Sequence, residues 1–137
     1  MALEKLLPQD DAFVIAADTV VAVGRRMLHK TDSPDIAEQY MHLLSGRRHK
    51  VYSAVAVRAP TGKTAFRVVP SVVGFSHLGK TQLQTYLASQ EWQGKAGGYA
   101  IQGLAACFID YLAGSYSGVV GLPLHETYKL LSGLGWR

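Results

Sequence analysis

The sequence predicts a single α/β domain over residues 1–137, in which helices flank a mixed β-sheet. Three observations lead to this class. Segments with strand patterning alternate with segments of helical periodicity, the length suits one domain with its own core, and no repeat or linker divides the chain. The composition, 48% apolar and 18% charged residues, is that of an ordinary globular protein.

The first third of the chain predicts a helical end, a strand and a complete helix. Residues 2–7 have the pattern of a last helical turn, which Pro8 ends, and the short apolar run 13–17 predicts a buried strand. Asp32-Ser33-Pro34 then supplies a cap followed by proline, and Gly46 ends the helix that begins there.

The middle of the chain predicts an antiparallel hairpin followed by a helix. Residues 50–58 place valines on one parity, Pro60-Thr61-Gly62 supplies a turn, and residues 64–75 are again rich in β-formers. Residues 81–89 have helical periodicity, and a glycine-rich loop follows at 94–98.

The C-terminal third predicts a last strand pair and a closing helix. Residues 105–112 and 116–120 are interpreted as two strands around Gly114. Residues 124–131, with Pro123 at their start, predict a helix. The expected buried stripe of this helix consists of Leu124, Tyr128 and Leu131.

Composition bears on the compartment and on partners. No apolar run is long enough to cross a bilayer and residues 1–7 lack the features of a secretory signal, so we expect a cytoplasmic protein that does not bind membranes. Cys107 is the single cysteine; it can form no intrachain disulfide, and we expect it to be a small core hydrophobe.

The formal charge of +4 does not indicate nucleic-acid binding. The basic residues gather only at 25–26 and 47–50, and Tyr52 is the one aromatic residue near either cluster. Solvated edges explain such clusters equally well, so a nucleic-acid-binding module is the weakest of the functional hypotheses.

Asp18 is the first candidate for chemistry. It directly follows the apolar run 13–17, so we expect its carboxylate at a strand end, where open α/β sheets place their ligand clefts. A carboxylate there can bind a divalent cation or accept a proton from water, but aspartate after a strand is also an ordinary turn former.

Three further residues are candidates for ligand contact. Lys30 and Lys95 can hold phosphate oxygens, and we expect the glycines of 94–98 to let a ligand approach the backbone. Gln102 offers both a donor and an acceptor to a base edge. The alternatives are solvated surface for the lysines and a structural role for Gln102.

The common hydrolase patterns are missing from this sequence. His29, His49, Ser53 and Glu91 have no spacing that specifies a metal site or a triad. There is no HExxH, CxxC, GxSxG or P-loop pattern.

Four segments together resemble the signature blocks of the Maf family, in the family's order: Ala17-Asp18-Thr19-Val20-Val21, residues 44–52, residues 95–103 and residues 114–124. The resemblance implies a Maf/HAM1-like (ITPase-like) fold with a nucleotide cleft. It also implies a homodimeric nucleoside triphosphate pyrophosphatase that depends on a divalent metal cation, Mg²⁺ or Mn²⁺.

The same resemblance implies roles for individual residues. Asp18 matches the family's catalytic base and metal-associated aspartate, and Lys30 matches a lysine that contacts the triphosphate. Thr19 and Gln102 match positions typical of the branch that cleaves dTTP and UTP rather than methylated GTP. Lys95 matches a loop lysine, to which we assign a phosphate contact.

The sequence also departs from the family pattern. The family's Ser-x-Ser-Pro-Arg-Arg loop and a catalytic glutamate precede the aspartate block, and neither occurs here, so we expect an N-terminally incomplete chain. His29, Thr31 and Ser53 are smaller departures. The two remaining hypotheses are a pyrophosphatase completed by the missing segment and a catalytically silent nucleotide-binding or protein-interaction remnant.

Overall fold

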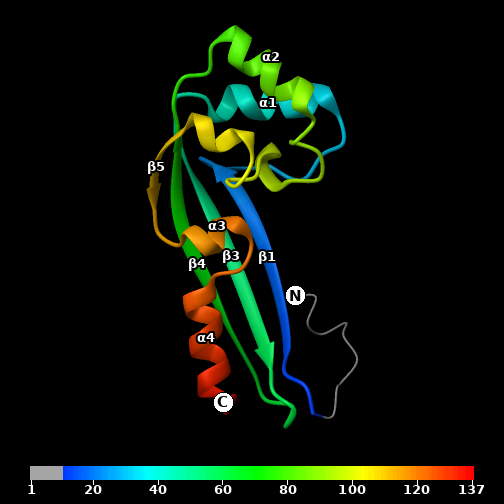
Figure 1. Ribbon diagram of the computed structural model, residues 1–137, viewed down its shortest axis with the longest axis vertical. Helices are drawn as coiled ribbons and strands as arrows, with labels where there is room; N and C mark the ends of the chain where they lie inside the picture. The colour runs from blue at the N-terminus through cyan, green and yellow to red at the C-terminus, as the bar shows by residue number, and fades with distance from the viewer. Residues whose placement is uncertain (1–10) are drawn as a thin grey trace.

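The computed structural model describes residues 11–137, so the helical turn expected at residues 2–7 lies outside the described part. In chain order the elements are β1 (Val14–Val23), β2 (Arg26–Met27), α1 (Pro34–Leu44), β3 (Arg48–Arg58), β4 (Thr64–Phe75), α2 (Lys80–Ser89), η2 (Ala96–Gly98), η3 (Leu104–Phe108), β5 (Ile109–Ala113), α3 (Tyr116–Val120) and α4 (Leu124–Gly133). The expected α/β class, a sheet flanked by helices, is confirmed (Figure 1).

The sheet has the order β2-β1-β3-β4-β5, and within residues 11–137 each of its strand pairs is antiparallel. Alternating strands and helices led us to expect a mixed sheet. The difference arises because α1 and α2 lie across one end of the sheet (Figure 1), so each returns the chain to the end it left. A parallel pair would require the connection to cross back along the sheet.

The signals for α1 and for the hairpin are confirmed. Ser33 caps α1, its Oγ accepting a hydrogen bond from the Ile36 amide at 3.4 Å, and Pro34 occupies the first turn. The turn of the β3–β4 hairpin is closed by the Ala59 amide, which donates to the Lys63 carbonyl at 2.9 Å.

The first strand is twice as long as the expected run 13–17. β1 continues through Asp18 to Val23, and Asp18 is paired with Ala54 of β3. A polar residue whose side chain points to solvent does not end a strand, because successive side chains of an extended backbone point to opposite faces of the sheet. The expectation that Asp18 stands at a strand end is therefore wrong.

The expected C-terminal strand pair is also wrong. Residues 104–108 form the 3₁₀ helix η3, only 109–113 form a strand, and 116–120 form α3. Side chains select these helices. Glu91 Oε1 accepts the Leu104 amide at 2.9 Å, and Ser115 Oγ caps α3 by accepting the Gly118 amide at 2.9 Å.

The closing helix α4 is confirmed, but it presents a different face to the sheet. Leu124 and Tyr128 are each 60% exposed, whereas Thr127 and Leu130 are buried. Leu130 packs with Val55 and Val57 of β3. This short helix has apolar residues on two faces, and the face that packs against the valines of β3 is the buried one.

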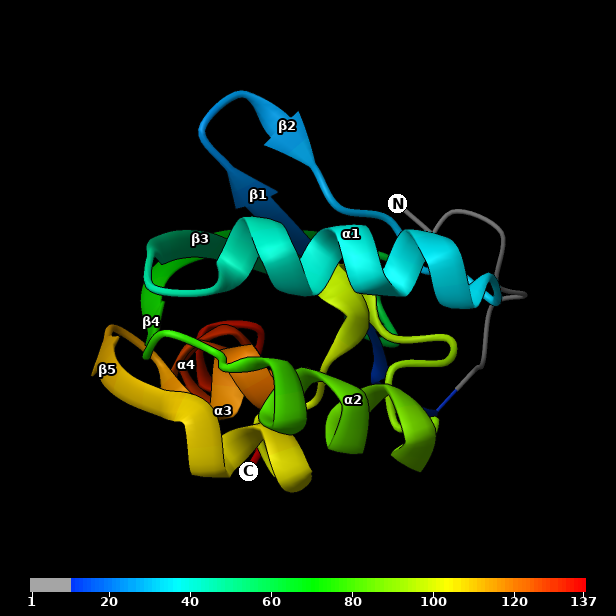
Figure 2. The same cartoon turned by 90° about the horizontal axis from the view of Figure 1, so that it is seen from above.

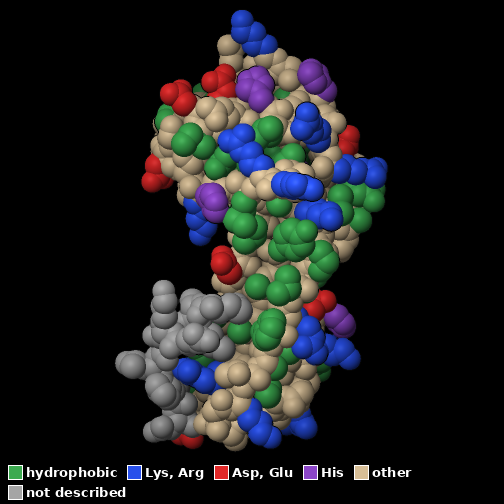
Figure 3. All heavy atoms as spheres, turned by 180° about the vertical axis from the view of Figure 1, so that it is seen from behind, with side chains coloured by type: hydrophobic (Ala, Val, Ile, Leu, Met, Phe, Trp, Pro, Cys, Tyr) green, Lys and Arg blue, Asp and Glu red, His purple; other side chains and the backbone are tan. Residues whose placement is uncertain are grey.

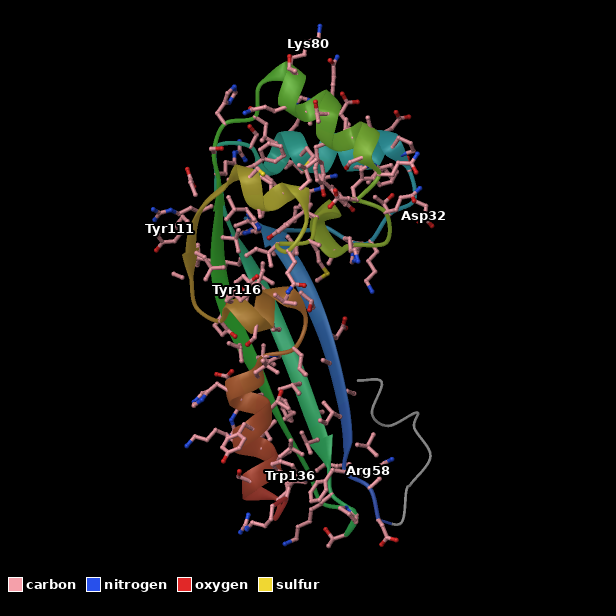
Figure 4. All side chains as sticks on the ribbon, viewed as in Figure 1. Asp32, Arg58, Lys80, Tyr111, Tyr116 and Trp136 are labelled. Atoms are coloured by element: carbon pink, nitrogen blue, oxygen red, sulfur yellow. The ribbon has the colours of Figure 1, made fainter. Side chains whose placement is uncertain are left out.

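Helices and loops form two groups on one side of the sheet (Figures 1 and 2). The first lobe consists of α1, α2 and the segment 90–108, and the second consists of α3 and α4. Figure 4 marks the extremes: Lys80 lies at the tip of the first lobe, Arg58 and Trp136 at the far end of the second, and Tyr116 between them.

The first lobe holds most of the core. Its central cluster joins buried side chains of α1, α2 and three strands to those of segment 90–108. Its largest members include Tyr40, Met41, Tyr86, Trp92 and Phe108. In the second lobe, Val119 of α3 belongs to this central cluster, whereas α4 packs on the smaller cluster of Val55, Val57 and Leu130.

The opposite side of the sheet carries exposed apolar side chains. Phe66 is 62% and Val68 53% exposed, and their strand partners Ala56 and Ala54 lie on the same face. Figure 3 views this side and shows hydrophobic side chains along the middle of the molecule.

The structure bears on two expectations drawn from composition, the burial of Cys107 and the absence of a membrane-spanning segment. Cys107 is exposed, so the expected core role is wrong; it lies on the outer side of η3, whose buried residues are Ala105 and Phe108. Within residues 11–137, no helix is both long and apolar enough to span a membrane.

Candidate functional site

A cavity of about 270 Å³ lies between the two lobes, on the side of the sheet that carries the helices. Its lining comes from five parts of the chain: β1, the residue Lys30, β3, the glycine-rich loop and the end of α3. In that order the lining residues are Ala17, Asp18, Thr19 and Val21; Lys30; Val51; Gly94, Lys95, Ala96, Tyr99 and Ala100; and Val119, Val120 and Gly121. A neighbouring hollow of about 330 Å³ shares Asp18, Thr19, Lys30 and Ala96 with it, so the two form one extended cleft. Four of the five predicted site residues thus line one cleft.

Asp18 reaches this cleft from the middle of an edge strand. Over residues 14–20, β1 pairs with β3 on one side and, within the described residues, with no strand on the other. The Thr19 amide donates to Asp18 Oδ1 at 2.9 Å, which orients the exposed carboxylate. The site therefore lies beside a strand edge rather than beyond a strand end.

Lys30 and Lys95 are brought together by backbone hydrogen bonds. The Gly97 amide donates to the Leu28 carbonyl at 2.9 Å, and the Gly94 amide donates to the Thr31 carbonyl at 3.2 Å. These two bonds enclose both lysines and hold their segments side by side. Both lysines are exposed, and both line the same cavity as Asp18.

The glycines of 94–98 differ from our expectation. A Cβ on Gly97 would lie 2.8 Å from Val21 Cγ1, and one on Gly98 would lie 3.4 Å from Met41 Cε. Both glycines are buried and have positive φ, so they allow the loop to pack against the protein. Only Gly94 of the three lines the cavity and has open space at its Cβ position, so ligand access is limited to that residue.

Gln102 is the predicted site residue that the cavity does not include. It is exposed in the turn that follows Ile101, two residues beyond the cavity-lining Ala100. Its assignment to base recognition stays a prediction.

Sequence reasoning missed one wall of the cavity. Val119 and Val120 belong to residues 116–120, which we interpreted as a strand, and Gly121 follows directly. Ser115 is a favoured N-cap residue, and this was the sequence signal that could have identified the start of α3. Buried Ser53 holds this wall, since its Oγ donates to the Gly118 carbonyl at 2.6 Å.

A buried aromatic cluster lies behind the glycine loop. Tyr99 lines the cavity, and its hydroxyl shares a 2.6 Å hydrogen bond with His49 Nε2. The rings of His49, Phe75 and Tyr99 meet edge to face with centroids 5.0–5.6 Å apart. Burial lowers the pKa of His49 to about 4 and raises the pKa of Tyr99, so both side chains are neutral near pH 7.

The fit of a divalent cation can be tested on the donors of the cleft. Among residues 11–137, no three His, Cys, Asp or Glu side chains are grouped so as to hold a metal ion. Mg²⁺, however, commonly uses one or two carboxylates and completes its shell with substrate phosphates and water. Asp18 fits this mode as a single ligand.

The fold and the cleft define an α/β protein whose interlobe site combines one carboxylate, two lysines and glycine backbone. The family model described as "Maf-like protein" matches residues 1–134. The chain therefore belongs to the Maf family.

Relatives in that family cover nearly the whole chain. A "dTTP/UTP pyrophosphatase" of Granulibacter bethesdensis is 57% identical over 99% of this chain and 66% of its own length. Another of that name from Maricaulis maris is 55% identical over 93% of this chain and 61% of its own length. A "Nucleoside triphosphate pyrophosphatase" of Anaplasma phagocytophilum is 52% identical over 96% of this chain and 68% of its own length. The chain thus spans less than two thirds of the first two relatives.

Proposed function

We propose that this chain forms the nucleotide cleft of a nucleoside triphosphate pyrophosphatase that hydrolyses dTTP and UTP to the monophosphate and pyrophosphate. The observation that carries the proposal is the convergence of Asp18, Thr19, Lys30 and Lys95, from three separate segments, on one cleft. Relatives at 55–57% identity bear the name dTTP/UTP pyrophosphatase, which supports the substrate class.

The proposed chemistry is attack of water on the α-phosphorus. The Asp18 carboxylate accepts a proton from the water, a P–O bond forms at the α-phosphorus, and the bond from it to the α,β-bridging oxygen breaks. Lys30 and Lys95 offset charge on the phosphate oxygens, including the charge that develops on the departing pyrophosphate.

A bound Mg²⁺ or Mn²⁺, held by Asp18, would supply further neutralisation of phosphate charge. The protein's own part is to orient the carboxylate, through the 2.9 Å bond from the Thr19 amide, and to hold the two lysines together.

The remaining features are proposals of the same kind. Thr19 lines the cleft beside Asp18 and supports discrimination against methylated GTP, with Gln102 as its expected partner in base recognition. We also propose a cytoplasmic homodimer that binds neither membranes nor nucleic acid. Sedimentation of the purified protein tests the dimer directly.

The test is release of pyrophosphate from equal concentrations of dTTP, UTP and 7-methyl-GTP, with Mg²⁺ or Mn²⁺. It uses the 137-residue chain and, in parallel, the chain preceded by a segment with the family's Ser-x-Ser-Pro-Arg-Arg loop. We expect faster turnover in the extended form, because each charge-assisted hydrogen bond to phosphate contributes roughly 1.5–3 kcal/mol. In that form Asp18→Asn should lower kcat at least about a hundredfold while unfolding stays unchanged.

The matched control is Asp110→Asn, which changes an exposed aspartate on β5 that does not line the cleft. Near-normal turnover of Asp18→Asn contradicts the proposed base. Faster cleavage of 7-methyl-GTP contradicts the substrate class, and nucleotide binding without turnover in either form supports the silent remnant instead.

A further inference from the structure

His49 is a buried polar residue that the proposed chemistry does not use. It lies on β3 and is only 2% exposed. Its Nε2 atom is bonded to Tyr99, while Nδ1 has no hydrogen-bond partner among the described residues. A buried nitrogen without a partner costs stability, so a role other than stabilisation has to be considered.

The place of His49 in the sheet connects it to the cleft. His49 and Val51 lie two residues apart on the same face of β3, and Val51 lines the cavity. Val51 is paired with Val21 of β1, the residue against which Gly97 packs. The imidazole therefore lies behind the cavity wall formed by β1 and the glycine loop.

Four hydrogen bonds hold the glycine loop, residues 94–100, in this position. Two of them reach the β2–α1 connection: the Gly97 amide donates to the Leu28 carbonyl at 2.9 Å, and the Gly94 amide donates to the Thr31 carbonyl at 3.2 Å. The third comes from α2, where the Tyr86 hydroxyl donates to the Gly98 carbonyl at 2.7 Å. The fourth, the bond of 2.6 Å between Tyr99 and His49, ties the loop to the strand that pairs with the Asp18 strand.

We propose that His49 is a positioning residue: through Tyr99 it fixes the glycine loop against β3, so that Lys95 keeps its place across the cleft from Asp18. This proposal rests on the proposed function for its ligand, a nucleoside triphosphate. The hydrogen bond is short, and its neighbours are aromatic rings that exclude water and limit rotation of both side chains.

The neutral state of the imidazole suits this role. Burial beside Phe75 and Tyr99 lowers the pKa of His49, so at neutral pH the bond to the Tyr99 hydroxyl joins two uncharged groups. A protonated imidazole at this depth would lack any carboxylate partner among the described residues.

The experiment uses the 137-residue chain and three variants of the pair. His49→Leu removes the imidazole and leaves the Tyr99 hydroxyl buried without its partner. His49→Gln is the conservative variant, because its terminal amide can occupy the place of Nε2. The double variant His49→Leu/Tyr99→Phe removes both polar groups, which restores stability where a single change does not.

The first readout is hydrogen exchange of the Gly97 and Gly98 amides, which needs no ligand. We expect at least tenfold faster exchange in His49→Leu and in the double variant, and near-parent exchange in His49→Gln. The exchange rate of the Leu83 amide in α2, which lies outside the loop, should stay the same in all variants. Unchanged exchange at Gly97 in His49→Leu overturns the proposal, whatever the chain does with nucleotides.

The second readout is the affinity for α,β-imido-dTTP, measured by calorimetry. We expect about tenfold weaker binding in His49→Leu, rescue in His49→Gln, and weak binding in the double variant although its stability has recovered. Adding Lys95→Ala to His49→Leu should give less than the product of the two single losses, because both act through the same loop. His125→Leu, on the exposed side of α4, is the control and should bind like the parent.

The outcomes separate the two proposals. Affinity that recovers together with stability, or losses that multiply independently, overturn the positioning role while leaving the proposed function intact. If neither the parent chain nor the form extended by the Ser-x-Ser-Pro-Arg-Arg segment binds the analogue, the proposed function fails, and hydrogen exchange alone decides whether His49 fixes the loop.

Discussion

The first lobe and the closing helix α4 are held to the sheet by different kinds of contact. The first lobe combines a large apolar cluster with buried polar anchors, such as Tyr86 on Gly98 and His49 on Tyr99. In the second lobe, α3 also has polar anchors, since Ser53 Oγ donates to the Gly118 carbonyl and the Ser115 amide donates to Ser71 Oγ, whereas α4 packs on Val55 and Val57 through Leu130. Polar anchors have directional geometry, whereas apolar contacts tolerate small shifts. Both walls of the cleft are therefore fixed by directional bonds, and α4, which does not line the cleft, is held mainly by apolar contacts.

The largest effect is expected where the first lobe touches β1. Gly97→Ala should lower the free energy of unfolding by about 3–5 kcal/mol, because φ is +71° and the new methyl would lie 2.8 Å from Val21 Cγ1. Gly94→Ala is the matched control, with φ of +67° but nothing within 4 Å, and should cost about 1 kcal/mol. Chemical denaturation of both variants measures the difference. Equal losses would mean that the loop is not packed tightly on β1.

The second lobe offers the corresponding comparison on α4. Leu130→Ala should cost about 3 kcal/mol, since Leu130 is 5% exposed against Val55 and Val57. Leu124→Ala, on the exposed face of the same helix, should change the free energy of unfolding by less than about 0.5 kcal/mol. A larger loss for Leu124→Ala than for Leu130→Ala would mean that the buried face of α4 is the one expected from the sequence, formed by Leu124, Tyr128 and Leu131.

Acid should lower the free energy of unfolding by a smaller amount, through His49, which anchors the first lobe to the sheet. The pKa of His49 falls from 6.5 to about 4 on folding, so below pH 6.5 the unfolded chain binds a proton that the folded chain does not. The contribution of neutral His49 to the free energy of unfolding is therefore fully present above pH 6.5, and it is lost as the pH falls toward 4. At pH 5 the loss is about 2 kcal/mol, at about 1.4 kcal/mol per pH unit.

Denaturation curves at pH 7 and pH 5 test this sign. The pH dependence should be reduced in His49→Gln, whereas His125→Gln should retain it, because His125 is exposed on α4. A parent chain with equal stability at both values would contradict the burial effect.

Helix caps, turn residues and alternating apolar residues correctly predicted those elements whose structure depends on neighbouring residues in the sequence. The cap at Ser33, the turn at residues 60–62 and the alternating valines of β3 each specify their element within a few residues. The α/β class was also predicted correctly. Asp18, Lys30 and Lys95 were named from their position and residue type, and Thr19 from the resemblance to the Maf family. The structure places these four residues along one cleft, and their roles stay predictions.

The errors arise where distant residues decide the structure. Glu91 selects a 3₁₀ helix at Leu104 from thirteen residues away, and β3 determines which face of α4 is buried. Asp18 was placed at a strand end because a charged residue was taken to stop a strand, whereas an exposed edge accepts it. The roles of Gly97 and His49 depend on contacts between segments, which no local pattern in one sequence reveals.

The exposed thiol of Cys107 gives the protein a natural reporter. It is the single cysteine in the sequence and lies on η3, shortly after the loop that carries Lys95 and Tyr99. A maleimide fluorophore would therefore label one position without any substitution, on the outer surface rather than in the core. Anisotropy or quenching of that dye would follow the motion of the first lobe during nucleotide titration. The same thiol makes a reducing agent necessary in storage, because two such chains could otherwise be crosslinked.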